Sequence, residues 1–400
     1  MTVLVADNIA DVGIDTLRDA GHRVASRPTL SGAALVDALS DTEPQVLIVR
    51  STTVTPEALD ASPALALIVR AGAGYDTIDV ASASDRGIFV ANCPGKNSVA
   101  VAELTLGLLV ALDRRIPDNV IEARAGHWNK AVYANAKGLK GRTLGVIGLG
   151  NIGTEVVHRA QAFDMNVVAW SRSLTPDGAA ALGVEHAEHP TDVAAASDAV
   201  TLHVASTPET QHLADRDFFD AMRDGAFFIN TTRAAVVDET ALAWAVNEKD
   251  VCAALDVVEG EPAQKEAPFD HPLAEHPDVY MTHHIGASTQ QAQNATAREA
   301  ARVVKTFANT GDVPNCVNLA TQTPATHQIT VRHLDQVGVL AGVLDDMRRA
   351  GWNIQEMSNR VFEGATAAVA SIRFDGPMDH GALDTIRARN DVLAVSLVEL

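Results

Sequence analysis

A glycine-rich turn set directly between an apolar run and a helical pattern is the feature that most restricts how this chain can fold. Residues 144–147 form the apolar run, residues 148–153 read Gly-Leu-Gly-Asn-Ile-Gly, and residues 154–164 have helical spacing. In such a unit the first glycine allows a tight turn, the second lets a pyrophosphate approach the backbone, and the third lets helix and strand pack closely. The pattern predicts a dinucleotide held at a helix N-terminus by Gly148, Gly150, Asn151, Ile152 and Gly153.

Apolar runs and helical patterns alternate on both sides of this turn. The first series of runs lies at 3–6, 46–49 and 67–70, with helical patterns at 13–20 and 56–62, and a second series lies at 143–147, 167–170, 199–203, 226–230, 253–257 and 279–282. This alternation predicts an α/β protein with two parallel-sheet domains of the Rossmann-like or flavodoxin-like kind. One long helix at 96–126 and another at 287–309 are expected to connect them.

A third unit follows a polar stretch that ends at Pro324. Its pattern is strand, helix, strand, strand, helix, strand, at 328–332, 339–350, 354–361, 367–374, 380–388 and 394–400. This βαββαβ order is typical of the ferredoxin-like fold.

The composition restricts compartment and partners. Lys and Arg total 31 against 51 acidic residues, for a net charge of −20, which argues against nucleic acid and anionic membranes and leaves an anionic substrate to a few local arginines. Cys93, Cys252 and Cys316 are far apart, which indicates buried thiols in a reducing compartment and neither a disulfide framework nor a metal site. No signal segment is visible, and the longest apolar run, 99–112, is shorter than the ~20 residues that span a bilayer, so we expect a cytoplasmic protein.

The second strand of the cofactor unit ends without the acidic residue that commonly binds the adenosine ribose. Ser171 and Arg172 follow Trp170 instead. Without a carboxylate a 2′-phosphate is not repelled, and Arg172 can pair with it or simply face solvent. NAD and NADP therefore both remain open as the cofactor.

Three polar residues, Arg233, Glu261 and His284, each follow a predicted strand of the second series. Loops at the carboxyl ends of parallel strands meet in one crevice. Hydride transfer between a 2-hydroxy acid and a nicotinamide needs a cation for the carboxylate, a group that exchanges the hydroxyl proton, and a carboxylate that orients this group. Arginine, histidine and glutamate meet these needs, so the three residues behind a dinucleotide motif predict a dehydrogenase.

Over residues 1–318 the chain resembles the D-isomer-specific 2-hydroxyacid dehydrogenase family. The resemblance lies in segments 148–153, 230–239, 254–257, 261–262 and 284–289. It implies that Arg233 binds the substrate carboxylate, that His284 is the acid/base in contact with substrate and cofactor, and that Glu261 supports it. It also implies that the cofactor is contacted by Asp256, Thr207 and Thr232. The implied domains are a substrate-binding domain of residues 1–98 and 285–318 and a dinucleotide-binding domain of residues 99–284.

Segments 49–55, 70–76 and 92–98 resemble the substrate loops of family members that oxidise 3-phosphoglycerate in serine biosynthesis. This implies substrate contacts from Arg50, Ser51, Ala73, Gly74 and Asn97, with Arg50 facing the phosphate and Lys130 reaching across a dimer. Arg50 in a strand-end salt bridge is the competing interpretation. Two other functions remain: an NADPH-using glyoxylate or hydroxypyruvate reductase, and a corepressor that uses the fold as a dinucleotide sensor.

Residues 327–400 resemble an ACT domain, an amino-acid-sensing module. His333, Asp335 and Asn353 occupy the positions that bind serine in regulated relatives. The resemblance implies a homo-dimer or homo-tetramer with a serine effector, and the alternative is a pairing module without a ligand. Three residues depart from the family pattern, namely His283 and Ala205 in place of prolines and Ser171 in place of an acid.

Overall fold

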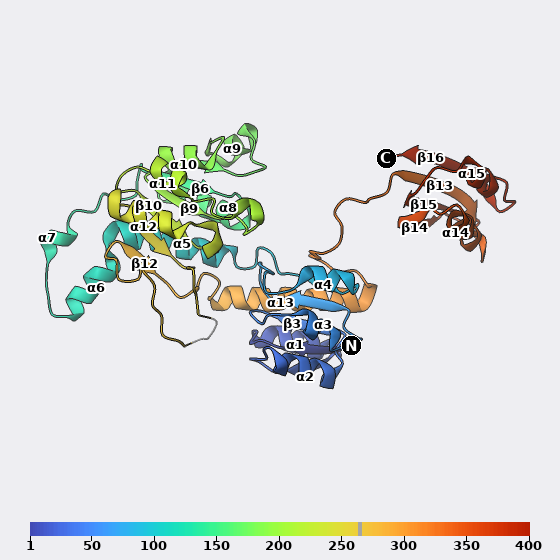
Figure 1. Cartoon of the computed structure of the whole chain (residues 1–400), viewed down its shortest axis with the longest axis horizontal. Coiled ribbons are helices and arrows are strands. Elements are labelled where there is room, and N and C mark those ends of the chain that lie inside the picture. The colour runs from blue at the N-terminus through green and yellow to red at the C-terminus, as the bar shows by residue number, and fades with distance from the viewer. Residues whose placement is uncertain (263–265) are drawn as a thin grey trace. The chain divides into compact units, whose positions relative to one another are not determined.

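A computed structural model describes residues 1–262 and 266–400 and divides the chain into two compact units, Met1–Asn318 and Leu319–Leu400 (Figure 1). The first unit contains two parallel sheets and the second contains one antiparallel sheet. The predicted α/β fold class with a ferredoxin-like C-terminal unit is therefore confirmed.

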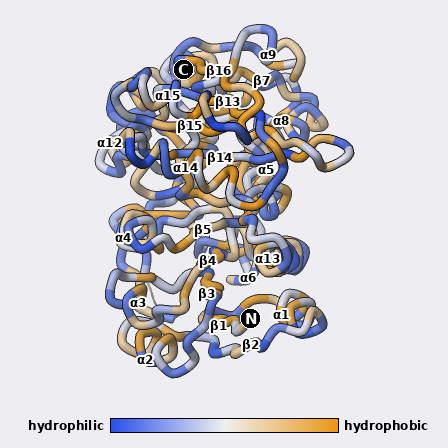
Figure 2. The backbone as a smooth tube through the Cα atoms, turned by 90° about the vertical axis from the view of Figure 1, so that its right-hand side faces the viewer, coloured by the Kyte–Doolittle hydropathy of each residue, from blue (hydrophilic) through white to orange (hydrophobic). Residues whose placement is uncertain are grey.

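The first sheet has five parallel strands in the order β2-β1-β3-β4-β5. Helices α1 and α13 cover one face, and helices α2, α3 and α4 cover the other. Because both faces are covered, the central strands β1, β3 and β4 are almost entirely apolar (Figure 2). The bounds are β1 Thr2–Val5, β2 Arg23–Ser26, β3 Val46–Val49, β4 Leu67–Arg70, β5 Phe89–Ala91, α1 Asp11–Asp19, α2 Ala33–Thr42, α3 Pro56–Asp60, α4 Val80–Asp85 and α13 Gln290–Thr310.

The second sheet has seven parallel strands in the order β12-β11-β10-β9-β6-β7-β8. Helices α5, α8 and α9 pack on one face, and α10, α11 and α12 pack on the other. The strands are β6 Thr143–Ile147, β7 Asn166–Trp170, β8 Glu185–His186, β9 Ala199–Leu202, β10 Phe227–Asn230, β11 Cys252–Leu255 and β12 Val279–Met281. The helices are α5 Ser98–Arg114, α8 Asn151–Ala162, α9 Pro176–Leu182, α10 Pro190–Ala196, α11 Arg216–Ala221 and α12 Glu239–Glu248.

The order in which strands are added to the second sheet reverses at β6: β7 and β8 extend the sheet on one side of β6, and β9 begins its extension on the other side. Ligands of open parallel sheets bind outside the carboxyl ends of the strands at such a switch point. The glycine turn follows β6, and the loops that carry Arg233, Glu261 and His284 follow β10, β11 and β12. The topology thus directs all four segments to the same edge.

The C-terminal unit is a four-stranded antiparallel sheet in the order β14-β15-β13-β16. Helices α14 and α15 supply one side of its core, which includes Val343, Met347, Leu383 and Ile386. The strand and helix order matches the predicted βαββαβ pattern. The bounds are β13 His327–Leu334, α14 Val339–Arg349, β14 Asn353–Val361, β15 Ala367–Asp375, α15 His380–Arg387 and β16 Val392–Glu399.

The structure corrects two predictions made from the sequence. The stretch 96–126 is not one helix: α5 ends at Arg114, Arg115 adopts a left-handed conformation with φ 50°, and α6 (Ile116–Arg124) and the short α7 (Lys130–Tyr133) follow. Only Cys93 is a buried thiol, because Cys252 and Cys316 are half-buried.

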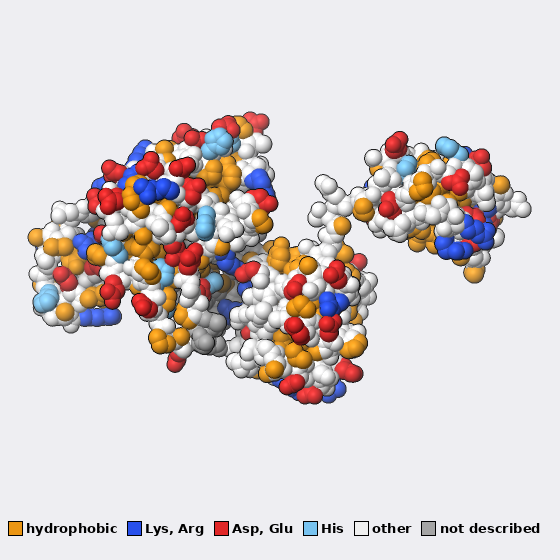
Figure 3. All heavy atoms as spheres, viewed as in Figure 1, with side chains coloured by type: hydrophobic (Ala, Val, Ile, Leu, Met, Phe, Trp, Pro, Cys, Tyr) orange, Lys and Arg blue, Asp and Glu red, His pale blue; other side chains and the backbone are white. Residues whose placement is uncertain are grey.

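The described residues contain no helix that is both long and apolar enough to cross a membrane. On the face of Met1–Asn318 seen in Figure 3, acidic side chains are widely spread, as the net charge of −20 leads us to expect.

Candidate active site

The three glycines of the turn after β6 have different surroundings, so the reason for a glycine is not the same at all three positions. A Cβ on Gly148, which has φ 97°, would lie 2.6 Å from the His203 carbonyl oxygen, and one on Gly153 would overlap the Gly148 carbonyl oxygen. Both are therefore required by packing. A Cβ on Gly150 would meet nothing within 4 Å. Open space at this glycine, at the start of α8, fits the approach of a pyrophosphate to the backbone, with Asn151 and Ile152 opening the helix.

The turn after β7 carries Ser171 and Arg172, the residues expected at the adenosine end of the cofactor. Ser171 is half-buried and Arg172 is exposed. The positive charge of Arg172 contributes to holding the pKa of Glu209 below its ordinary value, after hydrogen bonds from Thr207 and from the Glu209 backbone. Arg172 therefore lies within electrostatic range of the loop that follows β9.

The two threonines expected near the cofactor are held by their own loops. The amide of Thr207 donates to Thr210 Oγ1 at 2.8 Å. The amide and hydroxyl of Thr232 both donate to Asn230 Oδ1, at 2.9 and 2.6 Å, and Asn230 Nδ2 donates to the Arg233 carbonyl. Asn230 is fully buried at the end of β10 and fixes the turn that carries Arg233.

His284 and Glu261 form a pair at the carboxyl ends of β11 and β12. His284 Nδ1 lies 2.8 and 3.0 Å from the two Glu261 carboxylate oxygens, and both side chains are 43% exposed. The contact leaves His284 Nε2 directed away from Glu261. Such an arrangement suits a histidine that exchanges a proton through Nε2 while a carboxylate fixes its ring.

Asp256 holds the backbone of the His284 loop. It is only 2% exposed, and its carboxylate accepts hydrogen bonds from the Thr282 hydroxyl and the amides of Ile285 and Gly286, at 2.6 to 2.8 Å. The His284 amide donates to the Asp256 carbonyl, and His284 has φ 51°. This conformation is rare for a residue with a side chain. The Asp256 carboxylate was expected to contact the cofactor. In the structure its hydrogen bonds go to the loop that carries His284.

A cavity of about 690 Å³ lies beside this pair. Its lining includes the expected residues Arg50, Ser51, Asn97, Asp256, Glu261 and His284. The Asn97 Oδ1 atom is buried and has no hydrogen-bond partner among the described residues. Ala73 and Gly74 lie near but outside the lining, where Gly72 takes part instead, and Ala73 uses its carbonyl to accept a hydrogen bond from Asn92.

Arg70, at the end of β4, also lines the cavity, and sequence reasoning missed it. Burial lowers its pKa, the charges of Arg233 and Arg50 lower it further, and Asp76 partly opposes them. Its Nε is buried without a hydrogen-bond partner in the described part of the chain. A Cβ on Gly72 would overlap Arg70 Nη1, so that glycine provides the space for the guanidinium. Three arginines thus share one region in a strongly acidic chain.

Arg233 reaches this region from β10. Its Nη2 lies 3.3 Å from Asp76 Oδ1, its Nη1 donates to the Thr232 carbonyl, and its side chain is 33% exposed. Burial would raise the pKa of Asp76, but the charge and hydrogen bond of Arg233 hold it below its ordinary value. A Cβ on Gly74 would overlap Arg233 Nη2. The guanidinium therefore approaches the bare backbone of the 72–76 loop.

Asp7, two residues after the end of β1, is a second residue that the sequence analysis did not single out. Its Oδ2 accepts the amides of Arg50, Ser51 and Thr52 at 2.6 to 3.1 Å, and its Oδ1 accepts the Ser51 hydroxyl at 3.1 Å. Burial alone would raise the pKa of Asp7, but these hydrogen bonds hold it below its ordinary value. Asp7 thus shapes the loop that presents Arg50, and it occupies the Ser51 hydroxyl. A carboxylate after the strand 3–6 was the available signal.

The structure does not bring the expected effector residues together within one copy of the C-terminal unit. His333 pairs with Ala368 and Asn353 pairs with Asp375, seven residues apart on β15, which is roughly 23 Å at about 3.3 Å per residue. His333 is buried, with one ring nitrogen near the Leu334 carbonyl and the other near Asn359. Any site that uses both His333 and Asn353 needs two copies of the unit.

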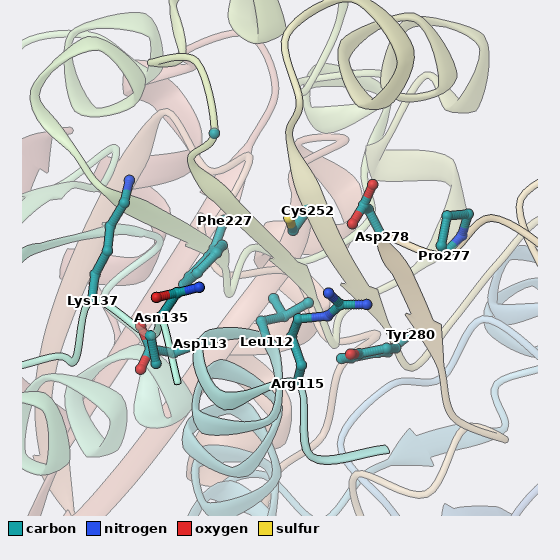
Figure 4. Close-up of a pocket in the computed structure, with 12 residues that line it drawn as sticks. Leu112, Asp113, Arg115, Asn135, Lys137, Phe227, Cys252, Pro277, Asp278 and Tyr280 are labelled. Carbon is teal, nitrogen blue, oxygen red and sulfur yellow. The ribbon is translucent and has the colours of Figure 1, made fainter. Parts of the chain in front are cut away.

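A second cavity, of about 190 Å³, lies at the opposite edge of the seven-stranded sheet (Figure 4). It is lined by residues at the amino ends of β10, β11 and β12, including Phe227, Cys252 and Asp278. Arg115 and Tyr280, which also line it, both use Asp118 as an acceptor. This is the edge away from His284, so the larger cavity is the candidate active site.

Comparisons with known proteins agree with this geometry. Residues 106–286 match the family model described as D-isomer specific 2-hydroxyacid dehydrogenase, NAD binding domain. The D-3-phosphoglycerate dehydrogenase of Methanocaldococcus jannaschii is 37% identical over 319 residues, which is 79% of this chain. The chain spans only 59% of the length of that relative.

Solved structures resemble the same part of the chain. The TT0316 protein of Thermus thermophilus has a TM-score of 0.71 and 32% identity, covering 79% of this chain and all of its own. An NADPH-dependent glyoxylate/hydroxypyruvate reductase from Sinorhizobium meliloti, solved with NADP and malonate, has a TM-score of 0.68 and 27% identity and covers 79% of this chain and 96% of its own.

Proposed function

The chain belongs to the D-isomer specific 2-hydroxyacid dehydrogenase family, and from this we propose that it oxidises 3-phospho-D-glycerate to 3-phosphohydroxypyruvate, the reaction of a D-3-phosphoglycerate dehydrogenase in serine biosynthesis. The observation that carries the substrate assignment is a group of three arginines: Arg50 and Arg70 line the cavity, and Arg233, outside its lining, is close enough for its charge to lower the pKa of Arg70. In a chain with a net charge of −20, such a group suits a substrate with two anionic ends.

We assign the carboxylate of the substrate to Arg233 and its phosphate to Arg50 and Arg70. The guanidinium of Arg233 lies beside the bare backbone of Gly74, so a carboxylate that replaces Asp76 as its partner can reach both. Arg50 and Arg70 line the cavity on the side of the first sheet, and Asn97 lines it as well. A planar guanidinium binds either anion through two parallel hydrogen bonds.

The proton of the substrate hydroxyl passes to His284 Nε2 in this proposal. Glu261 accepts the hydrogen bond from Nδ1 and stabilises the imidazolium that forms. A nicotinamide cofactor supplies the acceptor for the hydride that leaves C2. The turn at Gly148, Gly150 and Gly153 fits its pyrophosphate, since Gly150 alone has neither a packing reason nor a positive φ to require a glycine.

We propose NAD as the cofactor and measurable use of NADP. Ser171 offers no carboxylate to repel a 2′-phosphate, and Arg172 is exposed beside it. Glu209 lies within range of Arg172 and offsets part of its charge. The same Ser171-Arg172 pair supports the second candidate, an NADPH-dependent glyoxylate or hydroxypyruvate reductase, to which the chain is also similar in structure.

We also propose that the protein is a homo-oligomer. The α6–α7 segment exposes Ile121, Trp128 and Val132 by 65%, 88% and 44%, and a second copy would cover these apolar side chains. Pairing of two C-terminal units would likewise be required to assemble the effector site from His333, Asp335 and Asn353, with serine as the proposed ligand. Sedimentation of the full chain at micromolar concentration tests this, and a monomer would contradict it.

Initial rates with a matched substrate panel test the function. We expect the highest kcat/KM for 3-phosphoglycerate, measured in parallel with the reduction of glyoxylate and of hydroxypyruvate, each with NAD(H) and NADP(H). A preference for glyoxylate or hydroxypyruvate would replace the proposal by the second candidate. No turnover with any substrate, together with tight binding of NADH, would favour a dinucleotide sensor.

A further inference from the structure

A buried hydrogen bond outside the candidate active site joins helix α12 to His271. His271 Nε2 lies 2.7 Å from Glu239 Oε2, and the side chains are only 6% and 14% exposed. The Leu273 amide donates to His271 Nδ1 at 3.3 Å, so the ring proton is on Nε2 and points at Glu239. The ring of Phe269 stacks on His271 with 5.8 Å between centroids.

The second carboxylate oxygen of Glu239 contacts the backbone shortly before Glu261. Glu239 Oε1 accepts the amide of Glu259 at 2.7 Å, two residues before Glu261. One carboxylate therefore holds the chain at Glu259, two residues before Glu261, and is itself held in place by His271. Glu239 is itself the first residue of α12, whose N-cap Asp238 accepts two amides and whose apolar face lies in the core of the domain.

Glu261 depends on this support. Among the described residues its side chain hydrogen-bonds only to His284, and it is 43% exposed. No other described contact fixes the side chain, so its placement depends on the backbone that leads to it from Glu259. An error of about 1 Å in such a contact is enough to reduce turnover roughly 100-fold.

We propose that Glu239 and His271 are positioning residues that hold Glu261 against His284 during turnover. Neither residue lines the cavity, although His271 stacks on Phe269, which does, and both act on Glu261 through the Glu259 amide that Glu239 accepts. The proposal rests on the proposed function for its assay. It predicts an effect on hydride transfer that a purely stabilising pair would not have.

The test uses four variants of the full chain. In Glu239→Gln one acceptor oxygen becomes an NH₂ group that must face either the Glu259 amide or the His271 Nε2–H, so one of the two contacts is lost. His271→Leu removes the donor. His271→Gln is the conservative rescue, because its amide nitrogen can lie where Nε2 lies and donate to Glu239. Asp113→Asn is the matched control: it breaks a buried pair with Arg142 at the opposite edge of the same sheet.

We expect Glu239→Gln and His271→Leu to lower kcat by about 10- to 100-fold while the Kd for NADH, from its fluorescence, stays within about twofold of wild type. The primary deuterium isotope effect on kcat, measured with substrate labelled at C2, should rise because hydride transfer becomes slower than the other steps. His271→Gln should keep kcat within about threefold of wild type. Asp113→Asn should lower the Tm and leave kcat and the isotope effect unchanged.

Three results would overturn the proposal: unchanged kcat in both disruptive variants, losses in all four variants that follow the loss of Tm, or a rescue variant as slow as His271→Leu. If Glu239→Gln does not fold, the two His271 variants decide alone. If the wild type reduces glyoxylate and ignores 3-phosphoglycerate, the proposed function fails, while relative rates on glyoxylate still test the role of the pair.

Discussion

Replacing Arg70 with methionine should lower activity without lowering stability. In the folded chain burial and the charges of Arg233 and Arg50 depress the pKa of Arg70, which means that folding disfavours its charged form. That destabilisation is present at every pH below the lowered pKa, pH 7 included, so an uncharged side chain of similar length relieves it. The free energy of unfolding of Arg70→Met should therefore equal or exceed that of wild type.

The activity should change in the opposite direction. A hydrogen bond to a charged group contributes about 1.5–3 kcal/mol, which corresponds to roughly 10- to 150-fold in kcat/KM. Arg70 is assigned to the phosphate, so this loss should appear with 3-phosphoglycerate and be less than about threefold with an unphosphorylated hydroxy acid. Gly72→Ala should also lower kcat/KM for 3-phosphoglycerate, because the added Cβ would overlap Arg70 Nη1 and displace the guanidinium.

Two measurements decide between a binding role and a structural role for Arg70. Thermal unfolding with and without inorganic phosphate should show that phosphate raises the Tm of wild type more than that of Arg70→Met. Steady-state rates on the two substrate types give the selectivity. A lower Tm for Arg70→Met together with equal losses on both substrates would refute the reasoning, since it would make Arg70 a part of the fold alone.

Three further predictions follow from other parts of the chain. Ser171→Asp should shift the ratio of kcat/KM values toward NAD(H) by restoring a ribose acceptor and repelling the 2′-phosphate, and a wild type without detectable NADP(H) turnover would contradict it. Asp7→Asn should lower the free energy of unfolding by about 2 kcal/mol at pH 7. The pKa of Asp7 in the folded chain lies below its ordinary value of 3.8, so the loss of stability should be fully present above pH 3.8 and should shrink as the pH falls through the lowered pKa. Denaturant titrations that show the same loss at every pH would contradict this prediction. Truncation after Asn318, the end of the first compact unit, should leave an active dehydrogenase and abolish any inhibition by serine, and the absence of heat from serine in calorimetry of the full chain would reduce the C-terminal unit to an assembly module.

The central strands of the sheets could be predicted from the sequence, but the edge strands β2 and β8 and the interruption between helices α5 and α6 were not predicted. Strands β3 and β4 are covered on both faces, so nearly all their residues are apolar, and such a continuous apolar run can be recognised in the sequence. The edge strand β2 has the half-exposed sequence Arg-Val-Ala-Ser, and β8 has only two residues, so neither was predicted. The break at Arg115 was missed although Pro117, two residues further on, is a signal for the end of a helix.

The candidate site divides in the same way. His284 and Glu261 follow strands that meet at one edge, and their contact at 2.8 Å agrees with the roles expected for them, which remain predictions. The roles of Arg70, Asp7 and Glu239 were not predicted, because each acts on segments at least 20 residues away in the chain or on a cavity formed by many loops. Only the three-dimensional arrangement brings these charges to their partners.

The most direct test of the central claim follows the hydrogen at C2 of the substrate. Wild-type protein is mixed with NAD and 3-phospho-D-glycerate that carries deuterium at C2, and the mass of the NADH formed is measured for wild type and for His284→Ala. We expect singly deuterated NADH from wild type. His284→Ala should form the same product at least ~100-fold more slowly, with a Kd for NADH near that of wild type. Unlabelled NADH, no NADH at all, or wild-type turnover by His284→Ala would contradict the central claim.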